Sequence, residues 1–179
     1  PMLGVGGTQL FKAEIPGIDK DSKMAPRISQ TAKRLWLVYL TFTLLTCMGL
    51  KWAGMGWFDA VCHAMSAFSL GGFSSIAFFD SPAIEAVLIA ATILGAVNFA
   101  SHFAMAREKS PKPYWRDEEA RAMLTILAAS IAAASVYMWQ QGYYAPLEAL
   151  RYVGFNFVSI GLANGFANAD FATWPLLVT

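Results

Sequence analysis

Three runs of about 20 mostly apolar residues constrain this 179-residue chain more than any other feature. They extend from Leu35 to about Met55, from Pro82 to Ala106 and from about Ala120 to Trp139. An α-helix of about 20 apolar residues is long enough to cross the hydrocarbon core of a bilayer. Only 14% of the residues are charged, whereas soluble domains carry about 25%. We therefore predict an all-α polytopic membrane protein whose surroundings are the lipid bilayer.

The distribution of lysine and arginine predicts the orientation of these spans. Of the 13 basic residues, six precede the first run and five lie between the second and the third. Cytoplasmic loops are enriched in basic residues, so we expect 1–34 and 107–121 on the cytoplasmic side. Acidic residues interrupt the basic ones and no basic stripe forms, which argues against a nucleic-acid partner.

The segment between the first two spans cannot be an ordinary loop. Both of its ends face outside, yet Trp57–Phe68 is apolar and amphipathic and too short to cross the membrane and return. We expect a short helix that dips in from outside, followed by an extended return. Irregular backbone at membrane depth is tolerated only where protein buries it or where it lines a water-filled path.

The same organisation recurs 93 residues later. The second copy has the short helix APLEALRYVGFNFVSIG, the break LANGFANADF and a further apolar span that begins at Pro175. Five identities coincide at this single offset: Ser66 with Ser159, Gly72 with Gly165, Phe73 with Phe166, Phe78 with Phe171 and Pro82 with Pro175. The sequence therefore predicts repeated span–pore loop–span units with re-entrant pore helices.

Glycine-containing re-entrant loops are typical of cation filters. Backbone carbonyls replace part of the hydration shell of the ion, and glycine permits backbone angles that strain other residues. The negative, C-terminal end of each short helix would point toward the ion path. Uncharged side chains at these positions suit a site built from carbonyl oxygens. The candidate ligand residues are Ser69, Leu70, Gly71, Gly72, Leu162, Ala163, Asn164 and Gly165.

At these residues the chain resembles the Trk/Ktr/HKT superfamily of potassium transporters, and most closely its bacterial Trk-type membrane subunits. Four stretches carry the resemblance over essentially the whole chain: PMLGVGGTQLFKAE, GWFDAVCHAMSAFSLGGFSS, NFASHFAMAREKSPKPYWRDEEAR and FNFVSIGLANGFANADFATWPL. Such proteins have four span–pore loop–span repeats around a pseudo-fourfold pore. The chain, which opens on Pro1, is then expected to be a fragment of a longer protein.

The resemblance implies a division of the chain and a function. Residues 1–34 would be a cytoplasmic connector with the tail of the first repeat, and 35–106 the second repeat. Residues 107–121 would be a cytoplasmic loop, and 122–179 the third repeat, truncated at the start of its closing span. It implies potassium translocation across the cell inner membrane, with the N-terminal segment cytoplasmic and without a cofactor. It also implies a homodimer gated by a cytosolic nucleotide-binding ring subunit.

The third filter segment departs from the family pattern. That position usually reads Thr-Thr-Thr-Gly-Phe, whereas this chain has LANGF. The backbone carbonyls survive the change, but the hydroxyl groups do not.

Two other classes of function compete with transport. An intramembrane enzyme could use His63, which is four residues after Asp59 and next to Cys62, or His102. No third partner stands at a useful spacing, so packing and hydrogen bonding around the filter is the preferred interpretation of His63. A purely structural membrane subunit is the other alternative. We therefore expect a protein that is not an enzyme.

A few polar residues leave several roles open. Asn98 and His102 could contact the pore or form interhelical hydrogen bonds. Arg151 could pair with Glu148, three residues earlier, or with an acid such as Asp170 near the outer mouth, or reach the interface. The cysteines Cys47 and Cys62 are expected to be buried apolar residues.

The remaining polar stretches are expected to be connectors. GVGGTQ lacks the spacing of a nucleotide-binding loop and is better explained as a flexible exit from a preceding span. AREKSPKPYWRDEEAR, with its mixed charges, is interpreted as a solvated connector that could contact a regulatory partner.

Overall fold

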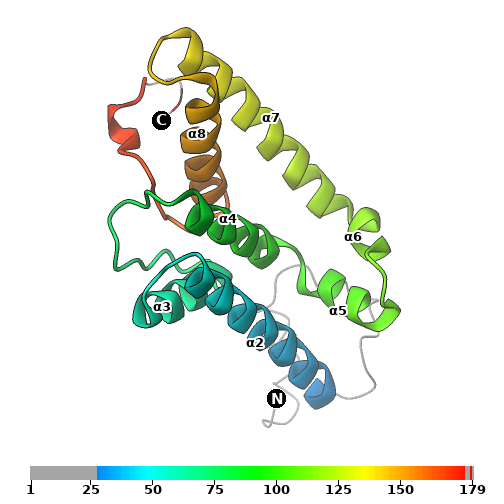
Figure 1. The fold of residues 1–179 in the computed structure, drawn as a ribbon. Helices are drawn as coiled ribbons and strands as arrows, with labels where there is room; N and C mark the ends of the chain where they lie inside the picture. Colours follow the sequence, from blue (N-terminus) through cyan, green and yellow to red (C-terminus); the bar gives the residue numbers. More distant parts are fainter. Residues whose placement is uncertain (1–27, 176–177, 179) are drawn as a thin grey trace. The chain divides into compact units, whose positions relative to one another are not determined.

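The computed structural model describes residues 28–175 and residue 178, and within these residues every regular element is helical. The elements, shown in Figure 1, are α2 (Ile28–Trp52), α3 (Trp57–Phe68), α4 (Pro82–Ala96), α5 (Phe99–Glu108), α6 (Lys112–Arg116), α7 (Glu118–Gln140), α8 (Pro146–Gly161) and a 3₁₀ turn at Phe171–Thr173. This confirms the predicted all-α class. The GVGGTQ stretch lies outside the described residues, as does most of the span expected from Pro175.

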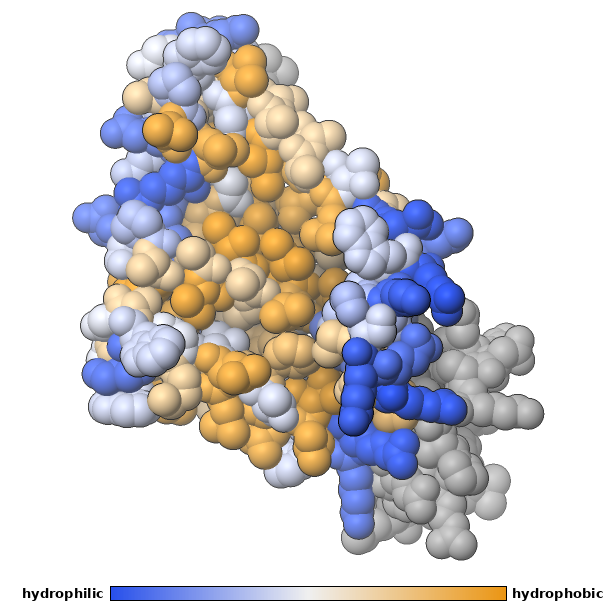
Figure 2. Space-filling model, turned by 45° about the vertical axis from the view of Figure 1, so that its right-hand side comes forward, coloured by the Kyte–Doolittle hydropathy of each residue, from blue (hydrophilic) through white to orange (hydrophobic). Residues whose placement is uncertain are grey.

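Two of these helices are long and apolar enough to cross a bilayer. They are Ala32–Trp52 within α2 and Glu118–Gln140, which is α7. Only 22% of the apolar window of the first and 11% of that of the second is buried within the structure. Exposed apolar side chains cover both helices, for example Leu37 at 61% and Ile126 at 67%. Figure 2 shows a broad hydrophobic surface on the face that it presents. These faces suit contact with lipid, and the chain is a membrane protein.

The second predicted span is not one continuous helix. α4 ends at Ala96 and α5 begins at Phe99, so the expectation of an unbroken helix from Pro82 to Ala106 was wrong. Asn98 adopts non-helical angles (φ −53°, ψ 126°) and its side-chain oxygen accepts a hydrogen bond from the Ala100 N–H at 2.9 Å. Asparagine favours this N-cap position because its oxygen satisfies an otherwise unpaired amide. Together α4 and α5 still pass as one interrupted span by length and composition.

The described residues divide into two compact units, of which the first comprises 28–41 and 97–121. Here His102 Nδ1 lies 2.6 Å from the Tyr114 hydroxyl, and the Ser101 hydroxyl donates to Asp117 at 2.6 Å. Hydrogen bonding is therefore one role of His102 within this unit. The stretch predicted as a solvated connector is partly ordered, because it contains α6. Burial raises the pKa of Tyr114, a residue of this short helix.

The second unit comprises residues 42–96 and 122–175, together with 178. Its core forms where α4 packs against both α3 and α8 (Figure 1). Three fully buried alanines, Ala60, Ala64 and Ala67, form a stripe along α3 that lets the helices approach closely. A Cβ added at Gly95 of α4 would lie 2.8 Å from the carbonyl oxygen of Phe68. Small residues therefore bring α4 against the C-terminal end of α3, where the first candidate filter segment begins.

Candidate functional site

The backbone after α3 and after α8 repeats at the 93-residue offset. α3 ends at Phe68 and α8 at Gly161. Two residues further on, Leu70 has φ 53° and its counterpart Ala163 has φ 60°. Gly72 then has φ 72° and Gly165 has φ 74°. A repeat first recognised from sequence identities is thus also a repeat of backbone conformation.

The C-terminal ends of α3 and α8 also form equivalent hydrogen bonds. The N–H of Gly71 donates to the Ser66 carbonyl at 2.9 Å, and the N–H of Asn164 donates to the Ser159 carbonyl at 2.7 Å. The N–H of Leu70 donates to Ala67 and that of Ala163 to Ile160. This pair of bonds is the Schellman motif, whose left-handed residue is usually glycine. A left-handed backbone costs about 1–2 kcal/mol for a residue with a Cβ, and such strain clusters at functional sites.

The fold brings the two candidate segments, 69–72 and 162–165, into contact. A Cβ placed on Gly72 would lie 2.7 Å from the carbonyl oxygen of Asn164. One placed on Gly165 would lie 3.7 Å from the Cα of Gly72. The eight candidate ligand residues therefore lie in two neighbouring backbone segments. Gly72 is so close to the carbonyl of Asn164 that only a hydrogen atom fits in the place of a side chain.

The side chain of Asn164 supports this arrangement from behind. It is fully buried and its amide nitrogen donates to the Thr92 hydroxyl of α4 at 2.5 Å. The same nitrogen lies 3.4 Å from the carbonyl oxygen of Ala67 on α3. The amide nitrogen is thus occupied within the protein, whereas the side-chain oxygen of Asn164 is buried and has no hydrogen-bond partner among the described residues.

His63 anchors the second pore loop. It is fully buried on α3, with Nδ1 2.7 Å from the Asp59 carbonyl and Nε2 2.8 Å from the hydroxyl of Ser74. Ser74 stands two residues after Gly72, so the ring links the pore helix to the return segment of the same repeat. This confirms the prediction that His63 packs and forms hydrogen bonds around the candidate filter. Among the described residues, no group of three or more histidine, cysteine, aspartate or glutamate side chains could hold a metal ion.

Asn156 occupies the equivalent position in α8, 93 residues after His63. It is also fully buried, and its amide nitrogen donates to the carbonyl of Tyr152 at 2.9 Å. It donates in addition to the side-chain oxygen of Asn168, three residues after Gly165, at 2.6 Å. Sequence reasoning missed both asparagines. The offset that aligns Asn156 with His63 is the signal that could have found the first.

Arg151 pairs with an acid, but with neither Glu148 nor Asp170. Its Nη2 lies 2.6 Å from Glu85 Oε1 and its Nε donates to Glu85 Oε2 at 3.0 Å, which forms a bidentate ion pair between α8 and α4. Asp80 lies 3.6 Å away as a weaker second partner. Glu148 instead accepts from the N–H of Ala145, and Asp170 accepts from a backbone N–H in its own turn. The pairing with Glu148 was therefore wrong, and Glu85 takes the place of Asp170, the acid given as an example.

Glu85 was missed at the sequence level, although a signal was present. It is an acid near the start of an otherwise apolar span, and it is 2% exposed. Ionisable residues in such segments usually face a partner inside the protein. The carboxylate accepts three hydrogen bonds, two from Arg151 and one at 3.0 Å from the Asn168 side chain.

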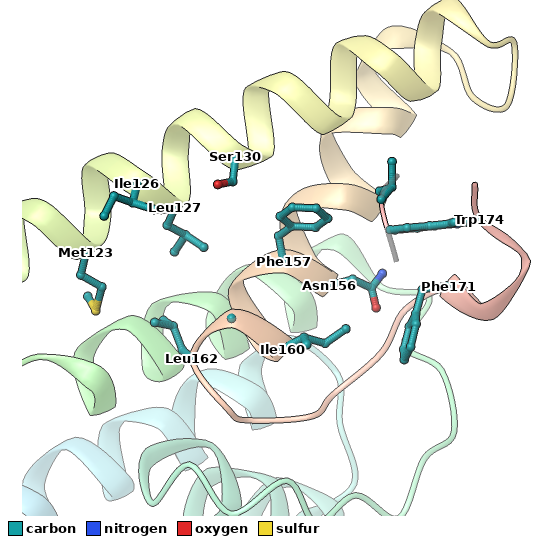
Figure 3. A pocket seen from close by; sticks show the side chains of 12 residues that line it. Met123, Ile126, Leu127, Ser130, Asn156, Phe157, Ile160, Leu162, Phe171 and Trp174 are labelled. Atoms are coloured by element: carbon teal, nitrogen blue, oxygen red, sulfur yellow. The ribbon is translucent and has the colours of Figure 1, made fainter. Parts of the chain in front are cut away.

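A cavity of about 450 Å³ lies between α7 and α8 (Figure 3). Its lining is mostly apolar and includes Met123, Ile126 and Leu127 from α7 and Phe157 and Ile160 from α8. A cation that has lost its hydration shell needs oxygen ligands from the protein, and this lining supplies few. The cavity suits an apolar group, and we do not place the ion path in it.

Comparison with known proteins identifies relatives over nearly the whole chain. The family described as "TrkH: Cation transport protein" matches residues 1–178. The Trk system potassium uptake protein TrkH of Halomonas elongata is 45% identical over 179 residues, which cover 98% of this chain and 37% of that protein. The protein of the same name from Salmonella typhimurium is 38% identical over 183 residues, which cover 99% of this chain and 38% of the relative.

A solved structure has the same fold. The crystal structure of the potassium transporter TrkH from Vibrio parahaemolyticus superimposes with a TM-score of 0.82 at 34% sequence identity, covering 97% of this chain and 37% of that one. The chain therefore spans somewhat more than a third of the length of the proteins that it matches.

Proposed function

Since the chain belongs to the TrkH family of cation transport proteins, we propose that it forms part of a potassium translocation pathway. In this proposal the segments 69–72 and 162–165 contribute backbone carbonyls to a selectivity filter. The rest of the full-length protein supplies two further segments, because two strips of carbonyls cannot surround an ion. The relatives are named as potassium uptake proteins, which supports potassium as the transported ion.

One observation carries the proposal: φ angles and helix-end hydrogen bonds of the two pore loops match at the same offset, and the loops meet. Left-handed residues recur at Leu70 and Ala163 and again at Gly72 and Gly165. A filter with pseudo-symmetry needs equivalent carbonyls from each repeat at one depth, and equal backbone angles supply them. Both non-glycine residues close Schellman motifs, so each pore helix ends with the same turn toward the candidate filter.

The surroundings of this filter follow from the same proposal. Residues 35–106 form the second repeat and 122–179 the third, joined by the segment 107–121. The excess of lysine and arginine favours an orientation with 107–121 in the cytoplasm and the filter near the outer side of the inner membrane. The family likeness further suggests a homodimer and a cytosolic nucleotide-binding ring as partners.

The test uses the full-length parent protein in proteoliposomes. Rubidium influx is measured as a potassium analogue, with sodium added as a competitor, and is normalised to the amount of inserted protein. We expect saturable influx that sodium competes with poorly, and reduced influx or reduced preference over sodium in Gly72→Ser and Gly165→Ser. Wild-type influx and unchanged ion preference in both variants would refute the filter assignment. Absence of influx in the parent would refute transport itself.

A further inference from the structure

The ion pair between Glu85 and Arg151 joins two repeats. Glu85 is in the first turn of α4, the closing helix of the second repeat, whereas Arg151 is on α8, the pore helix of the third. The Glu85 side chain is 3% exposed and that of Arg151 28%. Desolvating two charges costs free energy that their attraction does not always recover, so such a pair is weak grounds for stability. The role of this ion pair therefore lies in the segments that it holds in position.

Asn168 connects this ion pair to the return segment of the third pore loop. It is 6% exposed, donates to Glu85 at 3.0 Å and accepts from Asn156 at 2.6 Å. Because Asn168 follows Gly165 by three residues, the chain just after the candidate filter is fixed to α4 of the neighbouring repeat.

The same helix holds the chain just before Gly165. Thr92 is seven residues after Glu85 and so lies on the same face of α4. Its hydroxyl accepts from the buried side chain of Asn164 at 2.5 Å. α4 is therefore hydrogen-bonded to the third filter segment on both sides of Gly165. Thr92 bonds the residue before this glycine, and Glu85 bonds a residue after it.

The return segment of the second repeat meets the third repeat through the backbone, because the Phe79 N–H donates to the Ala167 carbonyl at 3.1 Å. The same segment is fixed by His63, which bonds Ser74 within the same repeat. His63 and Asn156 stand at equivalent positions but have different partners. The link to Glu85 on α4 is therefore the feature that distinguishes the third pore loop.

We infer that Glu85 is a positioning residue for ion selectivity: through Asn168 and Arg151 it sets the place of the third filter segment against α4. This inference rests on the proposed function. Its consequence is that loss of the Glu85 carboxylate changes which ion the protein prefers, and does more than lower the amount of folded protein.

The test compares variants of the full-length parent in proteoliposomes, with rubidium influx and sodium competition as readouts. Glu85→Gln removes the charge at nearly constant shape, and Asp80 remains available to Arg151. Asn168→Ala leaves the ion pair intact and removes the bonds of the return segment to Glu85 and to Asn156. Coupling between sites typically amounts to 5- to 150-fold, and we expect each variant to lose about tenfold in preference for rubidium over sodium. The double variant should lose no more than either single one, because both act through one connection.

Glu118→Gln is the matched control. It removes a glutamate from another ion pair, with Arg121 at 3.8 Å, but both side chains are well exposed. It should keep the parental ion preference. Parental preference per inserted molecule in Glu85→Gln and in Asn168→Ala would overturn the inference while leaving the proposed function standing. If only Asn168→Ala inserts, its ion preference decides. Absence of rubidium influx in the parent and in Glu118→Gln would instead overturn the proposed function, and the inference with it.

Discussion

Alanine substitutions at three glycines separate backbone strain from crowding in the candidate filter. Gly72, Gly165 and Gly142 have nearly equal φ angles of 72°, 74° and 76°. Each alanine therefore meets the same left-handed penalty of about 1–2 kcal/mol. The surroundings differ. The Cβ would meet nothing within 4 Å at Gly142, would make an ordinary contact at 3.7 Å at Gly165, and would lie 2.7 Å from the Asn164 oxygen at Gly72.

The crowding at Gly72 adds a second cost. To restore an ordinary contact of 3.4 Å, the two filter segments must separate by about 0.7 Å. Overpacking of this kind typically costs 1–3 kcal/mol. We therefore expect losses of about 1–2 kcal/mol for Gly142→Ala and Gly165→Ala, and about 2–5 kcal/mol for Gly72→Ala. The displacement also moves the carbonyl of Asn164, so ion preference should change most in Gly72→Ala.

Two assays on the full-length parent check this order. In detergent, the unfolding temperatures of Gly142→Ala and Gly165→Ala should be similar. The unfolding temperature of Gly72→Ala should be lower than both. Rubidium uptake with sodium competition should be parental in Gly142→Ala, weakened in Gly165→Ala and weakest in Gly72→Ala. A Gly165→Ala variant that is as impaired as Gly72→Ala would refute the argument from crowding. An altered ion preference in Gly142→Ala would refute the argument that only filter glycines matter.

Two further predictions follow from other parts of the chain. A cysteine at Ser110 should react with an impermeant reagent only from the cytoplasmic side and one at Gln141 only from outside; labelling of the second from the cytoplasm would overturn the proposed orientation. In Gly95→Ala the new Cβ would lie 2.8 Å from the Phe68 carbonyl oxygen. This variant should lower the unfolding temperature of the parent because α4 must move away from α3, and an unchanged unfolding temperature would show that the close approach is unimportant.

The pore helices could be predicted because local signals and length agree. α3 has the predicted bounds Trp57–Phe68, and α8 begins one residue after the predicted start at Ala145. Prolines and glycines at fixed offsets mark where each helix starts or ends, and these constraints act on the chain itself. The left-handed conformation of Gly72 and Gly165 was predictable for the same reason. The strain at Leu70 was not, because leucine gives no local indication of such a conformation.

The contacts between repeats could not be predicted from local patterns. Arg151 had acids nearby in sequence, yet its partner Glu85 is 66 residues away and reaches it only through the packing of α4 against α8. The break before α5 was hidden because the run from Pro82 to Ala106 is mostly apolar on both sides of it. Only Asn98, a residue that favours helix N-caps, marked it.

The approach of Gly72 to Asn164 also has a consequence for biosynthesis. The two residues are 92 positions apart, and a ribosome that adds about 5–20 residues per second needs roughly 5–18 s to make the chain between them. Once α4 is complete at Ala96, the third-repeat partners of Glu85 and Thr92 remain to be made for the rest of that interval. If helices enter the membrane in the order of their synthesis, α4 does so before the partners of these two polar side chains exist.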